Sequence, residues 1–479
     1  MSRQWDKAFD KAIRLEKEAQ FKSAKTIYED ILGHVTDKKI LEKVQFRMAD
    51  IDDLIAEKAI YQRIDENAKQ VLTEIGINIA ENQPLMDLLM EADAVDFENE
   101  TALFIPLKRA YIDHCLEQVP RELLEDPGMN TFGTGATSPF LKRDGDEELR
   151  PANGEEYKRI VHTVAEHQDT AGIFSLPVAC DKSISLFEIA QLMEKHYQGL
   201  KMITTNTMDD DEVTFLKGKA DWLDGTSLIT SLSPMNNMVA PFLRSARTGN
   251  ALLLIDQSLA GISAPISPEA FLTQTHAQVI FMMVVAQSVH PGISCVHCGI
   301  PGVIDAEGTL SYTSPHQTLI NAALARVNTW ITGFPSAQTG GSTSLTDVTP
   351  QALLESELSR NALRKYGVHI VRHAMGALGS LNFFSLEKFQ EDCQRESRSM
   401  EIFKECPKDV GVIPMYFPGD DHSLEGIREI AEKGDPRSAD HTLKNVDAFR
   451  MWEAMIRQAA EEKVYYPQLN DIIMDTIKT

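Results

Sequence analysis

The sequence predicts an α/β protein of parallel strands and helices, a pattern that fits a TIM-type (β/α)8 barrel. From about residue 126 onward, short apolar runs alternate with segments of helical periodicity. Two of these runs, Ser227–Ser233 and Leu252–Leu259, end in loops of small and polar residues, SPMNN and GISAPIS. A long helical pattern follows the second loop directly. Strand, loop and helix repeated in this order indicate parallel strands. The pattern alone leaves an open doubly wound sheet as an equal alternative.

The first 125 residues form two segments ahead of the barrel. Residues 1–60 are helical by composition, and their first half resembles a single tetratricopeptide-like hairpin. One hairpin does not make a repeat array, so a helical extension is the simpler interpretation. Residues 61–125 are expected to form an α/β elaboration, with a short strand at Ile75–Ile79 and a hairpin at Phe97–Ile105.

The barrel itself is assigned to residues 126–395. The clear strand candidates are Gly172–Ala179, Lys201–Asn206, Ser227–Ser233, Leu252–Leu259, Ser294–Ile300, Thr329–Ser336 and His369–Met375. Asn130–Ser138 is the candidate for the eighth strand. The helical patterns between them include Ile184–Tyr197, Phe271–Ser288, Gln317–Val327 and Gln351–Lys365. Residues 396–479 are predicted to form a charged helical tail, which the apolar run Val410–Pro418 interrupts.

Composition excludes several classes of function. The formal net charge of −24 disfavours nucleic acid and anionic membrane surfaces as partners. No run reaches 18 consecutive apolar residues, and the charged start of the chain is not a signal peptide. Six cysteines in 479 residues fit reduced thiols, so a cytoplasmic protein is expected. P-loop, dinucleotide-binding, nucleophile-elbow and H-E-x-x-H motifs are absent from the sequence.

Four motif blocks resemble the trimethylamine/glycine betaine:corrinoid methyltransferase family. They are the strand end SPM, the GISAPIS loop with its helix, the stretch EADAVD at Glu91–Asp96, and Ile105-Pro106. The resemblance implies a TIM barrel that moves a methyl group from a methylated amine to the cobalt of a corrinoid (cobalamin). The cobalamin-module sequence D-x-H-x-x-G is absent, so a separate corrinoid protein is the expected partner. Family habit suggests a homo-oligomer.

One loop bears on the substrate. Trimethylamine enzymes of the family carry pyrrolysine in a loop that corresponds to GFPSAQTGGSTS, where this chain has ordinary residues at Gly341–Thr343. The resemblance therefore implies the non-pyrrolysine branch and a glycine betaine-like quaternary amine. A flexible rim loop is the alternative interpretation of these small residues. The family's QNAE is replaced by Thr275-His276-Ala277-Gln278, which leaves open a tertiary amine, a larger betaine, or binding without catalysis.

Candidate site residues lie where predicted strands end or where aromatic rings could face a cation. Uncharged groups suffice for this reaction, because a quaternary ammonium releases a neutral amine without a general acid. The catalytic candidates are His373, Asn236 and Asn237. The substrate-binding candidates are Phe334, Phe174, Trp330, Gln338, His276, Gln278 and Ser342. Core packing is the alternative for the aromatic residues, turn formation for the asparagines, and a core-edge or helix-packing position for the histidines.

A metal site is not expected. Cys295, His297 and Cys298 have zinc-ligand chemistry, and His290 is near them in the sequence. On a strand, however, Cys295 and His297 share one face while Cys298 points to the other. The three side chains could not converge without breaking the strand, so buried thiols in a barrel wall are the preferred interpretation.

Overall fold

The computed structural model describes residues 2–96, 104–122, 131–135, 137–143, 149–304, 310–311, 315–366, 368, 370–405, 412–415 and 427. Eight parallel strands close into a barrel in the order β1-β13-β12-β9-β8-β5-β4-β3. The predicted barrel is therefore confirmed, including its eighth strand near residue 130. The barrel strands are β1 (Thr131–Thr134), β3 (Ala171–Ser175), β4 (Leu200–Ile203), β5 (Trp222–Thr226), β8 (Leu252–Asp256), β9 (Cys295–Gly299), β12 (Ser336–Thr339) and β13 (Ile370–Met375).

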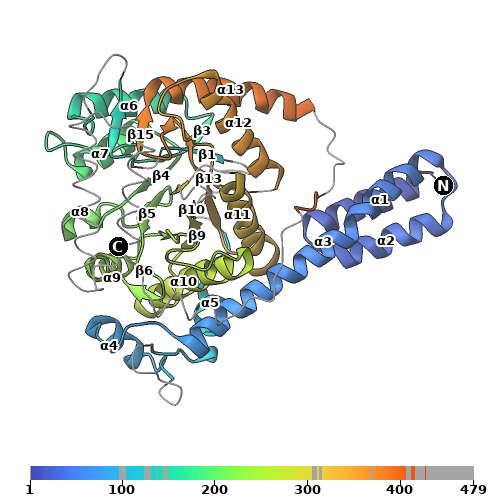
Figure 1. Ribbon diagram of the computed structural model, residues 1–479, viewed down its shortest axis with the longest axis horizontal. Coiled ribbons are helices and arrows are strands. Elements are labelled where there is room, and N and C mark those ends of the chain that lie inside the picture. The colour runs from blue at the N-terminus through green and yellow to red at the C-terminus, as the bar shows by residue number, and fades with distance from the viewer. Residues whose placement is uncertain are drawn as a thin grey trace.

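Helices surround this barrel, as Figure 1 shows. Three of them begin with a capping box, in which Asn153, Ser185 or Asp209 pairs with a glutamate three residues later. The predicted helical patterns thus start where their local sequence supplies a cap. The helices are α6 (Gly154–Glu166), α7 (Leu186–His196), α8 (Asp210–Thr214), α9 (Asn236–Thr248), α10 (Pro268–Val289), α11 (Pro315–Arg326), α12 (Pro350–Lys365) and α13 (Leu386–Glu405).

Alternating side chains divide the barrel wall into an inner and an outer layer. One apolar cluster fills the interior, with members such as Leu253, Val296 and Ala337. Their neighbours along the strands pack outward against the helices, as Leu252 and Leu254 do. Period-2 alternation on strands that are buried on both faces accounts for the continuous apolar runs in the sequence.

The N-terminal segment is helical, and its first two helices extend away from the barrel (Figure 1). It comprises α1 (Ser2–Lys17), α2 (Phe21–His34) and α3 (Lys38–Gln70), followed by the π-helical turn η1 (Val71–Ile75), α4 (Gln83–Glu91) and α5 (Arg109–Gln118). A buried ion pair of 2.6 Å between Glu16 and Arg47 joins α1 to α3. Helix α3 continues through residue 60 without a break and packs against α10.

Helix α10 is buried on all sides. The barrel covers one of its faces, and α3, α4 and α5 contact the others. This is why its sequence, from Phe271 to Gln287, shows no polar stripe. Arg63 of α3 is bound to Glu269 of α10 through two contacts of 2.6 and 2.7 Å. The N-terminal segment therefore stabilises the barrel directly.

Two predicted strands were misplaced. The fourth barrel strand is β5, and the run predicted at Ser227–Ser233 instead forms a small hairpin, β6 (Ile229–Thr230) with β7 (Ser233–Pro234). The first half of the run predicted at Thr329–Ser336 belongs to a π-helical turn, η2 (Val327–Thr332), which continues α11. Gly333 ends this helix in a left-handed conformation with a φ of +71°, as glycine often does at a helix C-terminus. The β-branched and aromatic residues before it favour a strand, so the sequence pattern predicted a strand instead.

The predicted strand at Ile75–Ile79 is also wrong. Ile75 ends η1, and among the described residues of this region the β-pairing consists of isolated bridges of Ile77 with Ile105 and of Val95 with Leu107. Residues 97–103 of the predicted hairpin lie outside the described residues. So does most of the predicted C-terminal tail beyond Glu405.

Short strands lie beyond the carboxyl ends of the barrel strands. The hairpin β14 (Ala377–Leu378) with β15 (Phe383–Ser385) pairs in parallel with β2 (Phe140–Lys142). A second hairpin joins β10 (Val303–Ile304) to β11 (Leu310–Ser311). These elements build the rim of the barrel at its carboxyl end.

Residues Val412–Met415 return to the N-terminal helices. The backbone N–H of Val412 donates to Glu16, and that of Met415 donates to Glu57. Both carboxylates are buried and each is also paired with an arginine, Arg47 or Arg326. These buried ion pairs thus join three parts of the chain that are distant in sequence.

We predict that Glu57→Ala lowers the free energy of unfolding by about 3–5 kcal/mol, because it leaves the buried Arg326 without its carboxylate. Glu66→Ala is the matched control, since it breaks a more exposed pair with Arg109 and is expected to cost about 1 kcal/mol or less. Urea denaturation measures both values. Equal losses in the two variants would contradict a structural role for the buried pair.

Candidate active site

Strand β13 departs from regular geometry near its carboxyl end. Phe132 of β1 pairs with Val371, and Thr134 pairs with Met375, so two steps along β1 match four along β13. His373 lies in this irregular stretch with a φ of +60°, which is unusual for a residue other than glycine. Bulges of this kind change where side chains point and often lie next to active sites.

Arg372 points into the barrel. Its side chain is 3% exposed, and its Nη1 donates to the sulfur of Cys298 at 3.2 Å, a member of the interior cluster. Its Nε has no hydrogen-bond partner among the residues that the structure describes. Among the residues that the structure describes, no carboxylate forms an ion pair with Arg372. The interior therefore holds a positive charge without a described counter-charge.

His373 follows directly and is 1% exposed. Neither ring nitrogen has a hydrogen-bond partner within the described part of the chain. Burial, together with the charge of Arg372, holds the pKa of His373 well below its ordinary value. The imidazole is therefore neutral, and it offers a donor and an acceptor to a bound molecule.

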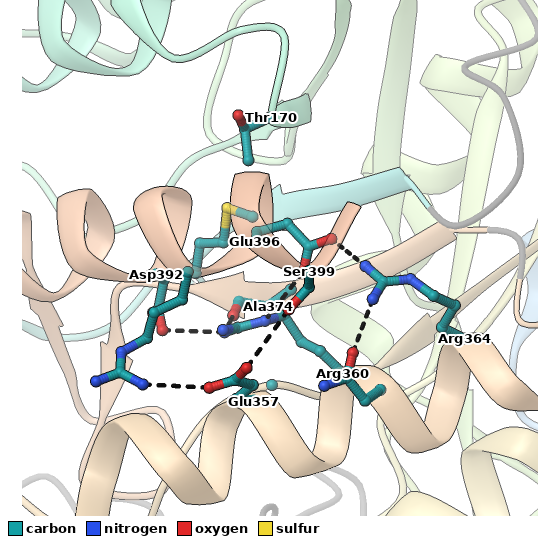
Figure 2. A network of polar contacts seen from close by, with 12 residues as sticks. Thr170, Glu357, Arg360, Arg364, Ala374, Asp392, Glu396 and Ser399 are labelled. Atoms are coloured by element: carbon teal, nitrogen blue, oxygen red, sulfur yellow. Dashed lines mark hydrogen bonds and ion pairs between the residues drawn. The ribbon is translucent and has the colours of Figure 1, made fainter. Parts of the chain in front are cut away.

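A buried network fixes the backbone on the carboxyl side of His373, as Figure 2 shows. Arg360 of α12 donates to the carbonyl oxygen of Ala374 at 2.9 Å and to Asp392 at 3.0 Å. Asp392 of α13 accepts from the backbone N–H of Gly376 at 2.9 Å and from Lys388 at 2.6 Å. Burial opposes the ionisation of Asp392, but the charges of Lys388 and Arg360 outweigh it and lower the pKa.

The same network continues between α12 and α13 (Figure 2). Glu396 accepts from Arg364 and lies 3.7 Å from Arg360, while Glu357 pairs with Arg395 at 3.2 Å. Each of these arginines thus faces a carboxylate. Because the two helices are joined through fixed charges, they form a rigid support behind the irregular end of β13.

The loop after β12 reaches this end of β13. A side chain at Gly341 would come within 2.8 Å of the Cα of Ala374, so only glycine fits there, with its φ of +82°. Ser342 follows, 4% exposed and with its hydroxyl unpaired among the described residues. At the tip of the β14–β15 hairpin, Leu381 packs against the interior cluster.

Comparison with known proteins decides the family. A family model described as "Trimethylamine methyltransferase (MTTB)" matches residues 33–463, about nine-tenths of the chain. The chain belongs to the trimethylamine methyltransferase family. It is thus a methyltransferase, as the sequence predicted. A "Glycine betaine methyltransferase" from Desulfitobacterium hafniense (strain Y51) is 25% identical over 418 residues, which cover 80% of this chain and 82% of that protein.

Solved structures include two similar to this member of the trimethylamine methyltransferase family. The monomethylamine methyltransferase MtmB of Methanosarcina barkeri aligns with a TM-score of 0.45 and 8% identity, over 81% of this chain and 86% of that one. A hydroxylamine complex of MtmB gives a TM-score of 0.44 and 9% identity over the same shares.

The structure brings two of the candidate residues, Ser342 and His373, to the irregular end of β13. The side-chain amide of Gln278 is bound elsewhere. It donates to Asp256 at 2.7 Å and to Ser258 at 2.9 Å, and it accepts from the backbone N–H of Leu232. Gln278 thereby ties the end of β8 to the β6–β7 hairpin. This contact explains why an amide can stand there in this member of the trimethylamine methyltransferase family.

His276 lies between α10, β9 and α3. One ring nitrogen is 3.0 Å from His297 and the other is 3.1 Å from Asp65. Cys298 points to the interior, whereas Cys295 and His297 lie on the outer face, as the alternation predicted. Among the described residues, no group of three or more His, Cys, Asp and Glu could hold a metal ion.

The remaining candidates are distributed over the molecule. Asn236 and Asn237 are exposed on the first turn of α9, where Asn236 accepts from Asn82. Phe174 packs edge-on against Tyr197 on the outer face of β3. Gln338 donates to Ser336 on the same strand.

Two aromatic residues that were placed on a predicted strand lie before β12 begins. Trp330 lies in η2 and packs edge-on against Phe21 and Tyr61, so it joins the barrel to the N-terminal helices. Phe334 is covered by the guanidinium of Arg121 at 4.2 Å. Both are at the amino end of β12, opposite the end at which TIM-barrel active sites form.

Sequence reasoning missed Arg372. A charged residue within the apolar run HIVRHAM was the available signal, since arginine is almost never buried unless it has a partner.

No helix among the described residues is long and apolar enough to cross a membrane.

We predict that Asp65 stabilises the fold in a pH-dependent way. Burial alone would raise its pKa, but His276 and Lys69 lower it to about 2. The stabilisation is therefore complete above about pH 4 and is lost as the pH falls toward 2. The difference in unfolding free energy between wild type and Asp65→Asn should shrink by about 1 kcal/mol from pH 5 to pH 3.

Denaturant titrations at both pH values measure this difference. Asp53→Asn, on an exposed part of the same helix, is the control and should give the same difference at both pH values. A pH-independent effect of Asp65→Asn would show that the contact with His276 contributes no charge interaction.

Proposed function

We propose that this methyltransferase moves a methyl group from a glycine betaine-like quaternary amine to the cobalt of a corrinoid carried by a separate protein. The observation that carries the proposal is the set of groups at the end of β13. His373 is neutral, and Arg372 does not give up its proton in proteins. Burial raises the pKa of the Cys298 thiol, which keeps it protonated. Arg372, His373 and Cys298 thus place no carboxylate and no strong proton donor on the inner side of this end of β13.

A quaternary ammonium suits such a site. Its nitrogen already carries the positive charge, so the amine leaves as a neutral molecule and needs no proton from the protein. A tertiary amine would have to be protonated or otherwise activated first. The ordinary residues at Gly341–Thr343 and the glycine betaine methyltransferase relative support the same substrate class.

The residues at this end of the barrel fit a corrinoid presented from outside. Unpaired polar atoms of His373 and Ser342 lie at the carboxyl end of the barrel, where a docked group would meet them. The chain's own sequence holds no cobalamin-binding motif. A reduced corrinoid supplies a nucleophilic cobalt for the methyl group. The protein's part is to hold the substrate in line and to exclude water, which Leu381 and the apolar interior favour.

Two alternatives remain within reach of the same assay. The protein could act on another methylated amine, such as a tertiary amine or a larger betaine. It could also bind a methylated amine without turning it over. Incubation with reduced cobalamin and a panel of methylated amines separates these cases, because only an enzyme changes the absorbance of the cobalt centre.

We predict that wild type methylates reduced cobalamin with glycine betaine as donor, and that His373→Ala slows this reaction by about 100-fold with the fold intact. His373→Asn is the second variant, since asparagine tolerates a positive φ and thus separates loss of the ring from backbone strain. Asn237→Ala, at an exposed position on α9, is the control and should keep the wild-type rate. A wild-type rate in both His373 variants would rule out its role.

A further inference from the structure

We infer that Arg372 binds the carboxylate of the substrate, so that the enzyme selects zwitterionic quaternary amines over purely cationic ones. This inference rests on the proposed function and makes its substrate class specific. It assigns substrate recognition to a single residue inside the barrel. It also explains why a charge is kept in an otherwise apolar place.

Arg372 keeps its positive charge although it is buried. Arginine stays protonated even when it is buried, so it cannot relieve the cost of burial by losing its charge. A buried charge is tolerated when a counter-charge or several hydrogen bonds satisfy it. Arg372 is 3% exposed, donates to one sulfur atom and leaves its Nε unpaired within the described part of the chain.

Three other buried arginines have the carboxylate partner that Arg372 lacks among the described residues. Arg47 is paired with Glu16, Arg326 with Glu57 and Arg360 with Asp392. Each of these three has an exposed fraction as low as that of Arg372. The charge of each is paired with a carboxylate of the chain itself, and all three lie outside the barrel interior. Arg360 also leaves Nε and Nη2 without hydrogen-bond partners among the described residues, so the ion pair is what distinguishes it from Arg372. Arg372 lies inside it, at the end where a substrate enters.

No described neighbour of Arg372 forms an ion pair with it. The Cys298 thiol is neutral because burial raises its pKa. Next to Cys298, the interior cluster contributes Val296 and Ile300, which carry no polar side-chain atoms. The carboxylate of Asp256, at the end of β8, accepts from Gln278 and from the backbone N–H of Ser258, and its charge raises the pKa of Cys298. Among the described residues it forms no ion pair with Arg372. An anion supplied by a ligand would complete the site.

The geometry of the guanidinium matches a carboxylate. Its planar fork can donate two parallel hydrogen bonds to the two oxygens, which fixes the orientation of the bound molecule. Cys298 stands one residue before the end of β9, so the guanidinium lies just below the rim. A carboxylate held there would leave the ammonium end of a short betaine nearer the rim, beside His373.

The same charge disfavours other methylated amines. Tetramethylammonium and choline are cations without a carboxylate, and Arg372 would repel them at short range in an interior of low polarity. Selectivity would thus come from repulsion of the wrong substrate as well as attraction of the right one. The inference predicts an order of affinity in which glycine betaine binds far more tightly than choline.

Calorimetric titration of glycine betaine, choline and tetramethylammonium into wild type, Arg372→Gln and Arg372→Lys tests this inference. We expect Arg372→Gln to weaken glycine betaine binding between roughly 10-fold and 100-fold, the usual loss for a charge-assisted contact. Its choline binding should stay the same or improve. Arg372→Lys keeps the positive charge but loses the planar guanidinium. Its affinity for glycine betaine should therefore lie between those of wild type and Arg372→Gln.

Thermal unfolding of the ligand-free proteins provides the control for folding. Arg372→Gln removes a charge that lacks a described partner, so its melting temperature should be equal to that of wild type or higher. Arg326→Gln breaks a buried pair and should lower it. Unchanged glycine betaine binding in Arg372→Gln, or wild-type binding of choline as tight as that of glycine betaine, would overturn the inference.

Methyl transfer to reduced cobalamin separates this inference from the proposed function. If wild type binds glycine betaine through Arg372 but transfers no methyl group from any amine, the inference stands and the proposed function fails. If wild type demethylates tetramethylammonium but neither binds nor demethylates glycine betaine, methyl transfer is retained and the role of Arg372 is refuted.

Discussion

The contact of Arg360 and Asp392 with the backbone of β13 is the constraint on which the site depends. In a regular strand the φ of His373 would be negative, whereas here it is +60°. Here the carbonyl oxygen of Ala374 and the N–H of Gly376 are held by charged groups of α12 and α13. These bonds compensate backbone groups that an irregular strand leaves outside the ladder. A strained backbone persists only when its surroundings determine it in this way.

That support has a consequence for charge. The positive and negative groups of the network form ion pairs with one another outside the barrel. Arg372 has no ion-pair partner among the described residues. The charged groups of α12 and α13 thus form a structural ion cluster that holds the backbone of β13 from outside, whereas the inward side chain of Arg372 on the same strand would recognise the substrate. A zwitterionic substrate would add the anion that Arg372 lacks. Its cationic end would then meet uncharged groups only, which suits a leaving amine that needs no proton.

Much of the fold could be predicted from sequence because the barrel strands are buried on both faces and read as apolar runs. Prediction was wrong where an aromatic, β-branched stretch at Val327–Thr332 adopted a π-helical turn through packing of Trp330 on α2 and α3. The site was harder. His373 and Ser342 were proposed from strand and loop ends, and the structure places both at the irregular end of β13, whereas Phe334 lies at the amino end of β12 and not at its carboxyl end. Arg372 was missed, since its significance depends on partners that only the folded chain reveals.

The most direct test of this account is a crystal structure of the protein with glycine betaine bound. The account predicts the carboxylate on the guanidinium of Arg372 and the trimethylammonium group beside His373, facing the carboxyl ends of the strands. Glycine betaine bound elsewhere, for example in the cleft between α6 and α7 that Lys158 and Glu188 line, would contradict it.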